Sequence, residues 1–524
     1  MPVTAPIEEN QAATSASVKT RAVSGVKVLA ARTLVSVLLR VVSSLVLARL
    51  LFPDDYGVFG VVSYITGLGM FLCDAGLAGA LVRQHREPTR DETFTVFWSQ
   101  QVLTALVVAA VIGTSPLLIH LYKLSPAALT LLVVMALGLF LSSLRVIPMM
   151  ALERDLQFPV IARCELIENL AQTASTIGFA YLGWGAWALA GGGIVRGVVG
   201  LLCVWLASPW RPQGRFHFAI VKQLARFGVA YQLNAIVPSL MGGWMPLVVG
   251  RILGVAAVGL VGWAGNIASV PMMLSGILNR VAFPAYSRLQ SDPEALGRYL
   301  ISSIRRISAL LCLIVPLAVI VCPILIPALF RARWTAAVPL VQWFSLECIL
   351  LTLTGIIASA QNATGHATER LGVSIGLGLA RWGFGYLGIV HFGLSGIGPV
   401  VFSISLCELL LTTYLVQWRN SGCGPLLNEV FRPLLMSGAI LGLSLGVGLI
   451  AVYNSLPLRT VISLLAFIAL EAICEVATQG RLLTVELRAL FAMFRPSFTN
   501  QSGSCLTNHQ PHNPSGAIRG CEQK

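Results

Sequence analysis

Charged side chains are scarce in this sequence: Asp, Glu, Lys and Arg together make up 11% of its 524 residues. A soluble domain normally carries about 25% charged residues, so the composition excludes a water-soluble globular protein. Hydrophobic residues make up 56% instead, and the mean hydropathy is +0.79. Apolar runs long enough to cross a bilayer as helices recur from Val26 to about Ala477, and they lack the alternation of β-barrel strands. The sequence therefore predicts an all-α polytopic membrane protein.

Motifs that hold metals, disulfides or nucleotides are also missing. The chain has 11 cysteines but no CxxC pair, and most of them lie inside apolar runs, as Cys73, Cys203 and Cys312 do. Its seven histidines form no cluster with ligand spacing, and no P-loop is present. We therefore expect no cofactor, no metal ion and no direct drive by ATP.

Long loops are absent as well, which bears on catalysis. The loops on one side of the membrane are all short, as the turns at 52–55 and 454–458 are, and no loop is large enough for an enzymatic domain. A membrane glycan polymerase or ligase typically carries a large external loop with catalytic basic residues, so this class is disfavoured. We expect a protein that is not an enzyme.

About fourteen transmembrane helices are predicted instead, in two sets of six and a final pair. They are expected near 26–51, 56–82, 94–121, 127–152, 160–182, 184–207, 227–253, 256–283, 307–330, 336–361, 372–392, 394–418, 434–454 and 459–477. The chain then divides into an N-terminal tail (1–25), a first six-helix lobe (26–207), a basic linker (208–226), a second six-helix lobe (227–418), two additional helices (434–477) and a polar, disordered tail (478–524).

The basic residues predict the orientation of these helices. Most Lys and Arg residues outside the spans lie in the tails and in alternate loops, and only Lys123, Arg331, Arg333 and Arg459 lie on the opposite side. Cytoplasmic loops are enriched in Lys and Arg, so both termini are expected in the cytoplasm. The loop "RARW" at 331–334 is the exception. This topology also accounts for the formal net charge of +14, so no nucleic-acid partner is expected.

A short repeat relates the two sets of six helices. The segment "LARLLFPDDYGVFG" at 47–60 has a fainter copy, "VGRILGVAAVGLVG", at 249–262. Arg49, Leu51, Gly57 and Gly60 recur in the copy as Arg251, Leu253, Gly259 and Gly262. Each copy joins the first two spans of its set, so the two lobes are expected to be parallel repeats around a central cavity. The glycines indicate close helix packing, and the two arginines are interpreted as interfacial anchors.

Three arginines lie near the centres of predicted spans, where a charge is costly: Arg40, Arg196 and Arg381. Five others, Arg32, Arg49, Arg145, Arg251 and Arg280, lie nearer span ends, where the side chain can reach the interface. Acids that could pair with the central arginines, or line a cavity, are Asp74, Glu165, Glu168, Glu347 and Glu408. The three central arginines fit an anion site, since the guanidinium binds phosphate oxygens bidentately, or structural ion pairs between helices. Arg40 is the strongest candidate for the anion site.

Two motifs carry a family resemblance. "ARLLFPDDYGVFG" at 48–60, followed by "GMFLCDAGLAGALVRQ" at 69–84, resembles the opening signature of the polysaccharide transporter family. This family belongs to the multidrug/oligosaccharidyl-lipid/polysaccharide flippase superfamily. "FGVAYQLNAIVPSLMGGWMPLVVGRILG" at 227–254 and "NRVAFPAYSRLQ" at 279–290 resemble the matching element of the second half. The second copy departs from the family pattern at Met245, Val261 and Gly262, so no ion-coupling residue is carried over there.

The resemblance implies a function in the bacterial inner membrane. Family members flip oligosaccharides linked to polyprenyl pyrophosphate from the cytoplasmic to the periplasmic leaflet, for exopolysaccharide, capsule or O-antigen assembly. Cationic residues of the central cavity hold the pyrophosphate, and Arg40 matches that role by position. The implied partners are the lipid-linked oligosaccharide, the bilayer, a polysaccharide polymerase and a chain-length regulator. A multidrug or small-solute exporter of the same fold is the alternative.

Overall fold

The computed structural model describes residues 35–36, 38–83, 86–122, 125–272, 285–419, 426–451 and 455–477. Within these ranges all regular secondary structure is helical, which confirms the predicted all-α class. Arg32, Arg280 and the tails 1–25 and 478–524 lie outside the described residues.

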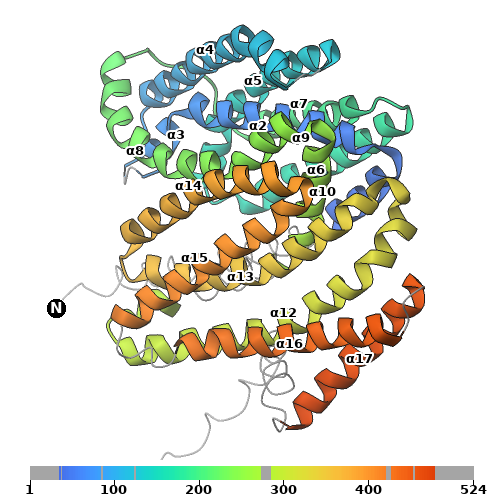
Figure 1. The fold of residues 1–524 in the computed structure, drawn as a ribbon. Helices are drawn as coiled ribbons and strands as arrows, with labels where there is room; N and C mark the ends of the chain where they lie inside the picture. The colour runs from blue at the N-terminus through green and yellow to red at the C-terminus, as the bar shows by residue number, and fades with distance from the viewer. Residues whose placement is uncertain are drawn as a thin grey trace, which may run out of the picture.

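A first helix over residues 38–50 precedes the labelled elements of Figure 1. The helices that follow are α2 (Pro53–Asp74), α3 (Leu77–Arg83), α4 (Arg90–Tyr122), α5 (Pro126–Arg154), α6 (Phe158–Tyr181), α7 (Ala186–Ala207), α8 (Phe218–Gly242), the π-helix η1 (Met245–Val249), α9 (Gly250–Leu253), α10 (Val255–Ala268), α12 (Pro293–Phe330), the 3-10 helix η2 (Ala332–Ala337), α13 (Val338–Ala363), α14 (Ala367–Phe392), the 3-10 helix η3 (Gly393–Gly396), α15 (Ile397–Arg419), α16 (Leu426–Ala451) and α17 (Leu456–Ala477).

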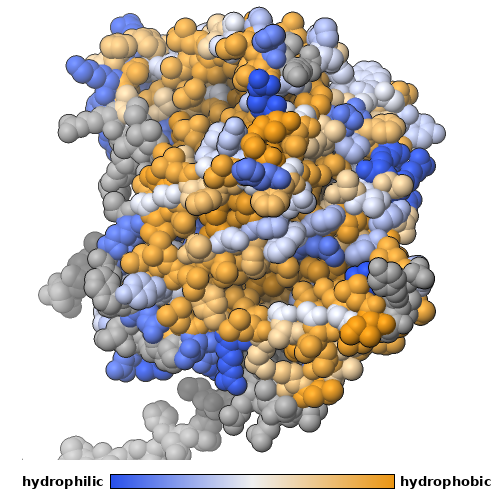
Figure 2. Space-filling model, viewed as in Figure 1, coloured by the Kyte–Doolittle hydropathy of each residue, from blue (hydrophilic) through white to orange (hydrophobic). Residues whose placement is uncertain are grey.

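Ten ranges of the described chain are helical, long and apolar enough to cross a membrane. One of them, Glu369–Gln417, covers most of both α14 and α15. Polar and charged residues interrupt α6, and α10 has only 14 residues, so neither is among the ten. Each of the expected spans nevertheless overlaps a described helix. On the face seen in Figure 2, hydrophobic residues dominate between the two margins where helices end.

The helices form two bundles and an added pair. The first bundle contains the first helix and α2 to α7, and the second contains α8 to α15. In Figure 1 α4 and α5 lie at the top and α12 at the bottom, with α14 and α10 between them. The added pair, α16 and α17, packs together and against α12. This is the fold of two parallel six-helix repeats followed by two further helices.

The two copies of the sequence repeat face each other where the bundles meet, because α2 packs against α10. A Cβ on Gly57 would lie 1.7 Å from the carbonyl oxygen of Val255, and one on Gly259 would lie 1.8 Å from that of Pro53. Only glycine permits backbones to approach so closely. Gly262 has open space around its Cβ position, so the contact does not require glycine there.

The segment 331–334, which is the exception to the expected distribution of basic residues, binds the end of the first helix. Arg333 donates to the carbonyl oxygens of Leu51 (3.2 Å) and Arg49 (3.3 Å). The indole N–H of Trp334 donates to the carbonyl oxygen of Ala48 at 2.8 Å. The last carbonyls of a helix have no partner within the helix, so the short helix η2 of the second bundle caps a helix of the first. Arg49 in turn donates to the carbonyl oxygen of Leu329 at 2.7 Å.

Aromatic rings fill the space behind this cap. Trp334 is fully buried, with its ring centroid 4.4 Å from that of Trp263 and 5.4 Å from that of Tyr56. We call this side of the molecule, where α2 begins and α12 ends, the Pro53 end. Backbone contact, hydrogen bonds and aromatic packing between the bundles together close it.

The bundles also meet at the opposite side, the Arg90 end, where α4 begins. A Cβ on Gly76 would lie 2.1 Å from the carbonyl oxygen of Gly228 in α8, and Gln232 of α8 donates to the carbonyl oxygen of Phe71 at 2.7 Å. Helix α8 begins at Phe218, inside the segment expected to be a linker, so the helix starts before the membrane span expected from 227. Polar residues hide this start from a search for apolar runs.

Candidate functional site

Glu168 of α6 bridges two arginines of the first bundle. Its Oε2 lies 2.7 Å from Nη1 of Arg145 in α5, and its Oε1 lies 3.3 Å from Nη2 of Arg196 in α7. The Glu168 side chain is only 2% exposed, whereas that of Arg196 is 45% exposed. We call these residues the first-bundle triad. Its formal charge is positive, because two guanidinium groups share one carboxylate.

A glycine of α7 makes room for this triad. A Cβ on Gly200 would lie 2.2 Å from Oε2 of Glu168 and 2.8 Å from Nη1 of Arg145. Every other residue at this position would have to displace one partner of the ion pair. The site therefore depends on a residue without a side chain, which carries no chemical signal in the sequence.

Arg40 lies on the first helix, which packs beside α6. Asn169 of α6 donates to Ser36 Oγ at 3.3 Å, and Leu47 lies in one apolar cluster with Ala180. The cluster lies further along both helices than the Ser36–Asn169 hydrogen bond, so the two helices run parallel. Arg40 therefore lies about one helical turn beyond Asn169 along α6.

Arg196 lies at the same level of α6. Helix α7 is antiparallel to α6: a Cβ on Gly192 would meet Thr176, and one on Gly200 would meet Glu168. Arg196 is midway between these contacts, so its backbone is level with the turn of α6 that follows Asn169. The register thus brings Arg40 and Arg196 to one depth, on two helices that share a neighbour.

Arg381 lies in a separate cluster in the second bundle. Its Nη2 is 3.2 Å from Oε2 of Glu408 and donates to Ser405 Oγ at 3.0 Å. Ser405 donates onward to Oε1 of Glu347, a buried residue of α13, at 2.7 Å. We call these four residues the second-bundle cluster. Its formal charge is negative, with two carboxylates around one guanidinium.

The two bundles thus carry opposite charges at corresponding places. Consecutive helices α5, α6 and α7 supply Arg, Glu and Arg, whereas α13, α14 and α15 supply Glu, Arg and Glu. Arg196 and Glu408 occupy nearly the same position along α7 and α15. If the two halves are structural repeats, the charge pattern of one is inverted in the other.

The other two predicted acids are Asp74 and Glu165. Asp74 accepts hydrogen bonds from Gln100 and from the backbone N–H of Ala78. Glu165 lies about one turn before Glu168 on α6 and is half-buried. Over the described ranges, no three His, Cys, Asp or Glu side chains are placed to hold a metal ion.

Sequence reasoning misplaced Arg145, which was expected to reach the membrane interface. The structure pairs it with Glu168 instead, and its side chain is 20% exposed. Two features of the sequence could have indicated this pairing: Arg145 lies well before the end of α5, and the next helix carries a glutamate. Ser405, which connects Arg381 to Glu347, was also missed, because an isolated serine in an apolar run carries no signal.

The two-bundle membrane fold is shared with solved transporters. The structure is similar to the lipid II flippase MurJ in its inward closed conformation, with a TM-score of 0.67 and 12% identity, over 86% of this chain and 99% of that one. It is also similar to an inward-facing multidrug resistance MATE family transporter, with a TM-score of 0.60 and 14% identity, over 74% and 95% of the two chains. At this level of identity the likeness shows the fold.

The sequence specifies the family within that fold. Residues 46–339 match the family described as "Polysaccharide biosynthesis protein", and the chain belongs to it. The lipopolysaccharide biosynthesis protein WzxC of Escherichia coli is 27% identical over 442 residues, which cover 80% of this chain and 85% of WzxC. The resemblance read from the two sequence motifs is therefore confirmed.

Proposed function

We propose that this protein moves an oligosaccharide linked to polyprenyl pyrophosphate across the bacterial cytoplasmic membrane, from the cytoplasmic to the periplasmic leaflet. The family, the similarity to WzxC and the fold shared with a lipid II flippase support this proposal. The observation that carries it is the placement of Arg40 and Arg196 at one depth along α6. Exopolysaccharide, capsule or O-antigen assembly is the process that uses such a substrate.

The two arginines suit a pyrophosphate group. A guanidinium presents a planar fork of donors and keeps its charge at any working pH, so it pairs with phosphate oxygens bidentately. Arg196 uses Nη2 for Glu168, and 45% of its side chain is exposed, so other donors of the fork can face a ligand. Among the residues with coordinates described, Arg40 has no ion-pair partner, and its side chain is exposed. Arg40 binds the pyrophosphate in this proposal, and Arg196 and Arg381 support it.

Alternating access follows from the two bundles. The polyprenyl tail stays in lipid while a cavity between the bundles shields the charged head and the sugars. The lobes at 26–207 and 227–418 rock about this site, so the contacts of the Pro53 end and those of the Arg90 end break in turn. In this proposal the Arg90 end and both termini face the cytoplasm, because the loops on that side are rich in Lys and Arg. A polysaccharide polymerase and a chain-length regulator are the proposed protein partners at the other face.

Binding of undecaprenyl pyrophosphate to the full-length protein in lipid nanodiscs tests the arginine assignment. Arg40→Gln and Arg196→Gln are each expected to raise the Kd by about 10–100-fold, the equivalent of one charge-assisted hydrogen bond. Arg381→Gln is expected to have a smaller effect, because two carboxylates surround this arginine. Arg163→Gln, at the exposed start of α6, is the matched control. Unchanged binding by folded variants at all three positions would rule out the assignment.

A multidrug or small-solute exporter is the second candidate. The MATE-like fold favours it, as does the negative second-bundle cluster, which would suit a cationic solute. Ethidium efflux from proteoliposomes distinguishes the two functions. Efflux that requires Glu408 and is insensitive to Arg40→Gln would favour the exporter, whereas the flippase is expected to show none.

A further inference from the structure

Prolines interrupt the hydrogen-bond ladder of α12. This helix contains Pro316, Pro323 and Pro327. A proline has no backbone N–H, so the carbonyl oxygen four residues before it loses its donor within the helix. In lipid no water replaces that donor, and a side chain of a neighbouring helix can supply it instead. The donors to these carbonyls therefore show which bends of the helix the fold holds in place.

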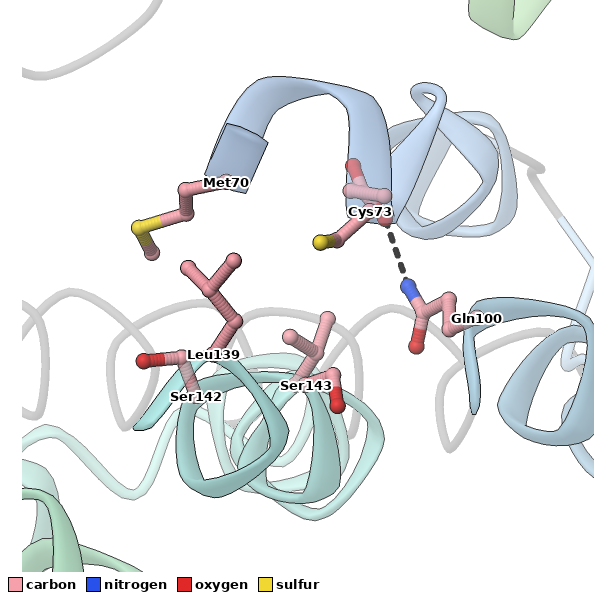
Figure 3. A pocket seen from close by; sticks show the side chains of 8 residues that line it. Met70, Cys73, Gln100, Leu139, Ser142 and Ser143 are labelled. Atoms are coloured by element: carbon pink, nitrogen blue, oxygen red, sulfur yellow. Dashed lines mark hydrogen bonds between the residues drawn. The ribbon is translucent and has the colours of Figure 1, made fainter. Parts of the chain in front are cut away.

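The first bundle shows how such a bend is fixed. Pro148 of α5 leaves the carbonyl oxygen of Leu144 without its usual donor, and the indole N–H of Trp205 in α7 donates to it at 3.0 Å. The helix also has little space to move into, because the cavity between α2, α4 and α5 has a volume of only about 50 Å³. Figure 3 shows this cavity, with Met70 of α2 and Leu139 of α5 beside it. The bend in α5 therefore belongs to a rigid bundle.

The first bend of α12 is tied to the added pair of helices. Pro316 frees the carbonyl oxygen of Cys312, and the hydroxyl of Ser437 in α16 donates to it at 3.0 Å. Cys312 and Ser437 are both buried. Pro316 lies about 20 Å before the end of α12, so this hydrogen bond holds the middle of the helix and not its end.

The second bend is tied to α13. Pro323 frees the carbonyl oxygen of Val319, and the side-chain N–H of Gln342 donates to it at 3.0 Å. The thiol of Cys322 also lies near this oxygen, at 3.4 Å, but a thiol is a weak donor. Val319 is buried, so the amide of Gln342 is the main group that satisfies this carbonyl.

The hydrogen bond of Gln342 encloses the residues that close the Pro53 end. We call residues 324–337, the last turns of α12 and all of η2, the cap segment. This segment contains the carbonyl of Leu329 and the side chains of Arg333 and Trp334, which bind the end of the first helix. Gln342 thus joins the chain just before the cap segment to the chain just after it.

We infer that Pro323 is a hinge for the cap segment and that Gln342 is a positioning residue that holds this hinge in its closed setting. When the Pro53 end opens, α12 bends further at Pro323, the hydrogen bond from Gln342 breaks, and the cap segment leaves the first helix. The carbonyl of Val319 then faces the water that enters. The inference rests on the alternating access of the proposed function, but it does not depend on which cargo the bundles carry.

Labelling of a cysteine at Ala337 tests the hinge in the full-length protein, reconstituted in lipid nanodiscs without substrate. Ala337 is fully buried in the cap segment, so opening of the Pro53 end exposes it to a soluble maleimide. The protein that retains Ala337 gives the background from native cysteines. Gln342→Met removes the donor and keeps the length of the side chain. It should speed labelling about tenfold, because a buried carbonyl is left without its main donor in the closed state.

A second substitution should reverse this effect. Pro323→Ala restores a backbone N–H, which can donate to the carbonyl of Val319 within α12. Labelling of Ala337→Cys in the Pro323→Ala/Gln342→Met variant should therefore return to the rate seen without either change. A double variant that is labelled as fast as Gln342→Met alone would overturn the inference.

Two controls separate the hinge from a general loss of stability. Ser437→Ala removes the donor to the other freed carbonyl of α12, away from the cap segment, and should leave labelling at Ala337→Cys unchanged. A cysteine at Ala360, buried near the other end of α13, should not be labelled faster in Gln342→Met. Unchanged labelling at Ala337→Cys in Gln342→Met, or equal acceleration in either control, would overturn the hinge. Since labelling needs no substrate, a failure to flip glycolipid with labelling as expected would count against the proposed function alone.

Discussion

Gly57→Ala is expected to lower the rate of transport strongly by hindering closure of the Pro53 end. The added methyl group would lie 1.7 Å from a backbone oxygen of α10, and a backbone atom cannot move aside as a flexible side chain can. Overpacking of a tight contact costs about 1–3 kcal/mol, so the closed population should fall by about one to two orders of magnitude. Flipping of lipid-linked oligosaccharide in proteoliposomes is the readout.

The repeat motif supplies the control for this experiment. Gly262→Ala changes the same residue type in the second copy, where the new Cβ would meet no atom within 4 Å. It should transport at the wild-type rate. Closure itself can be followed with a cysteine at Ala337, which is fully buried at the Pro53 end and should react with a soluble maleimide faster when Gly57→Ala is also present. Normal transport and protection in Gly57→Ala would show that the bundles do not close through this contact.

Glu168→Leu is expected to lower the free energy of unfolding by about 3 kcal/mol, the lower limit for breaking a buried ion pair by removing one partner. The variant leaves Arg145 largely buried without a counter-charge. The lower limit applies because Arg145 and Arg196 are 20% and 45% exposed. Unfolding of the detergent-solubilised protein by SDS provides the measurement.

A compensating substitution distinguishes the loss of the pair from the loss of packing. Replacing a complete buried ion pair with apolar residues of similar size is often neutral or stabilising. Arg145→Met combined with Glu168→Leu should therefore recover most of the lost stability. A double variant less stable than Glu168→Leu alone would show that Arg145 contributes through contacts other than this ion pair.

The sequence predicts more of the fold than of the candidate site. Apolar runs fix where helices cross the membrane, and α6, with three charges, still begins within two residues of its expected start at 160. Pairing between helices depends on rotation and register, which a single sequence does not contain. The five acids were therefore identified as candidates, but their partners came only from the structure. Gly200 and Ser405 could not be identified from the sequence for the same reason, because the role of each depends on the side chains that it contacts on neighbouring helices.

The two lobes share their helix packing, but their charged clusters have opposite signs. The copies at 47–60 and 249–262 keep the glycines that bring α2 and α10 together, and this contact joins the bundles almost symmetrically. The first-bundle triad and the second-bundle cluster break that symmetry. A repeat can therefore predict where two helices touch without predicting what either lobe binds.

The hydrogen bonds from Arg333 and Trp334 to the end of the first helix have a consequence for hydration. When the Pro53 end opens, the carbonyl oxygens of Ala48, Arg49 and Leu51 lose these donors. Such groups are too costly to leave bare in an apolar medium, so water must take the place of the donors. In the proposed alternating-access cycle, opening at this end therefore requires water to enter, and the hydrogen bonds of Arg333 and Trp334 keep water out while they last.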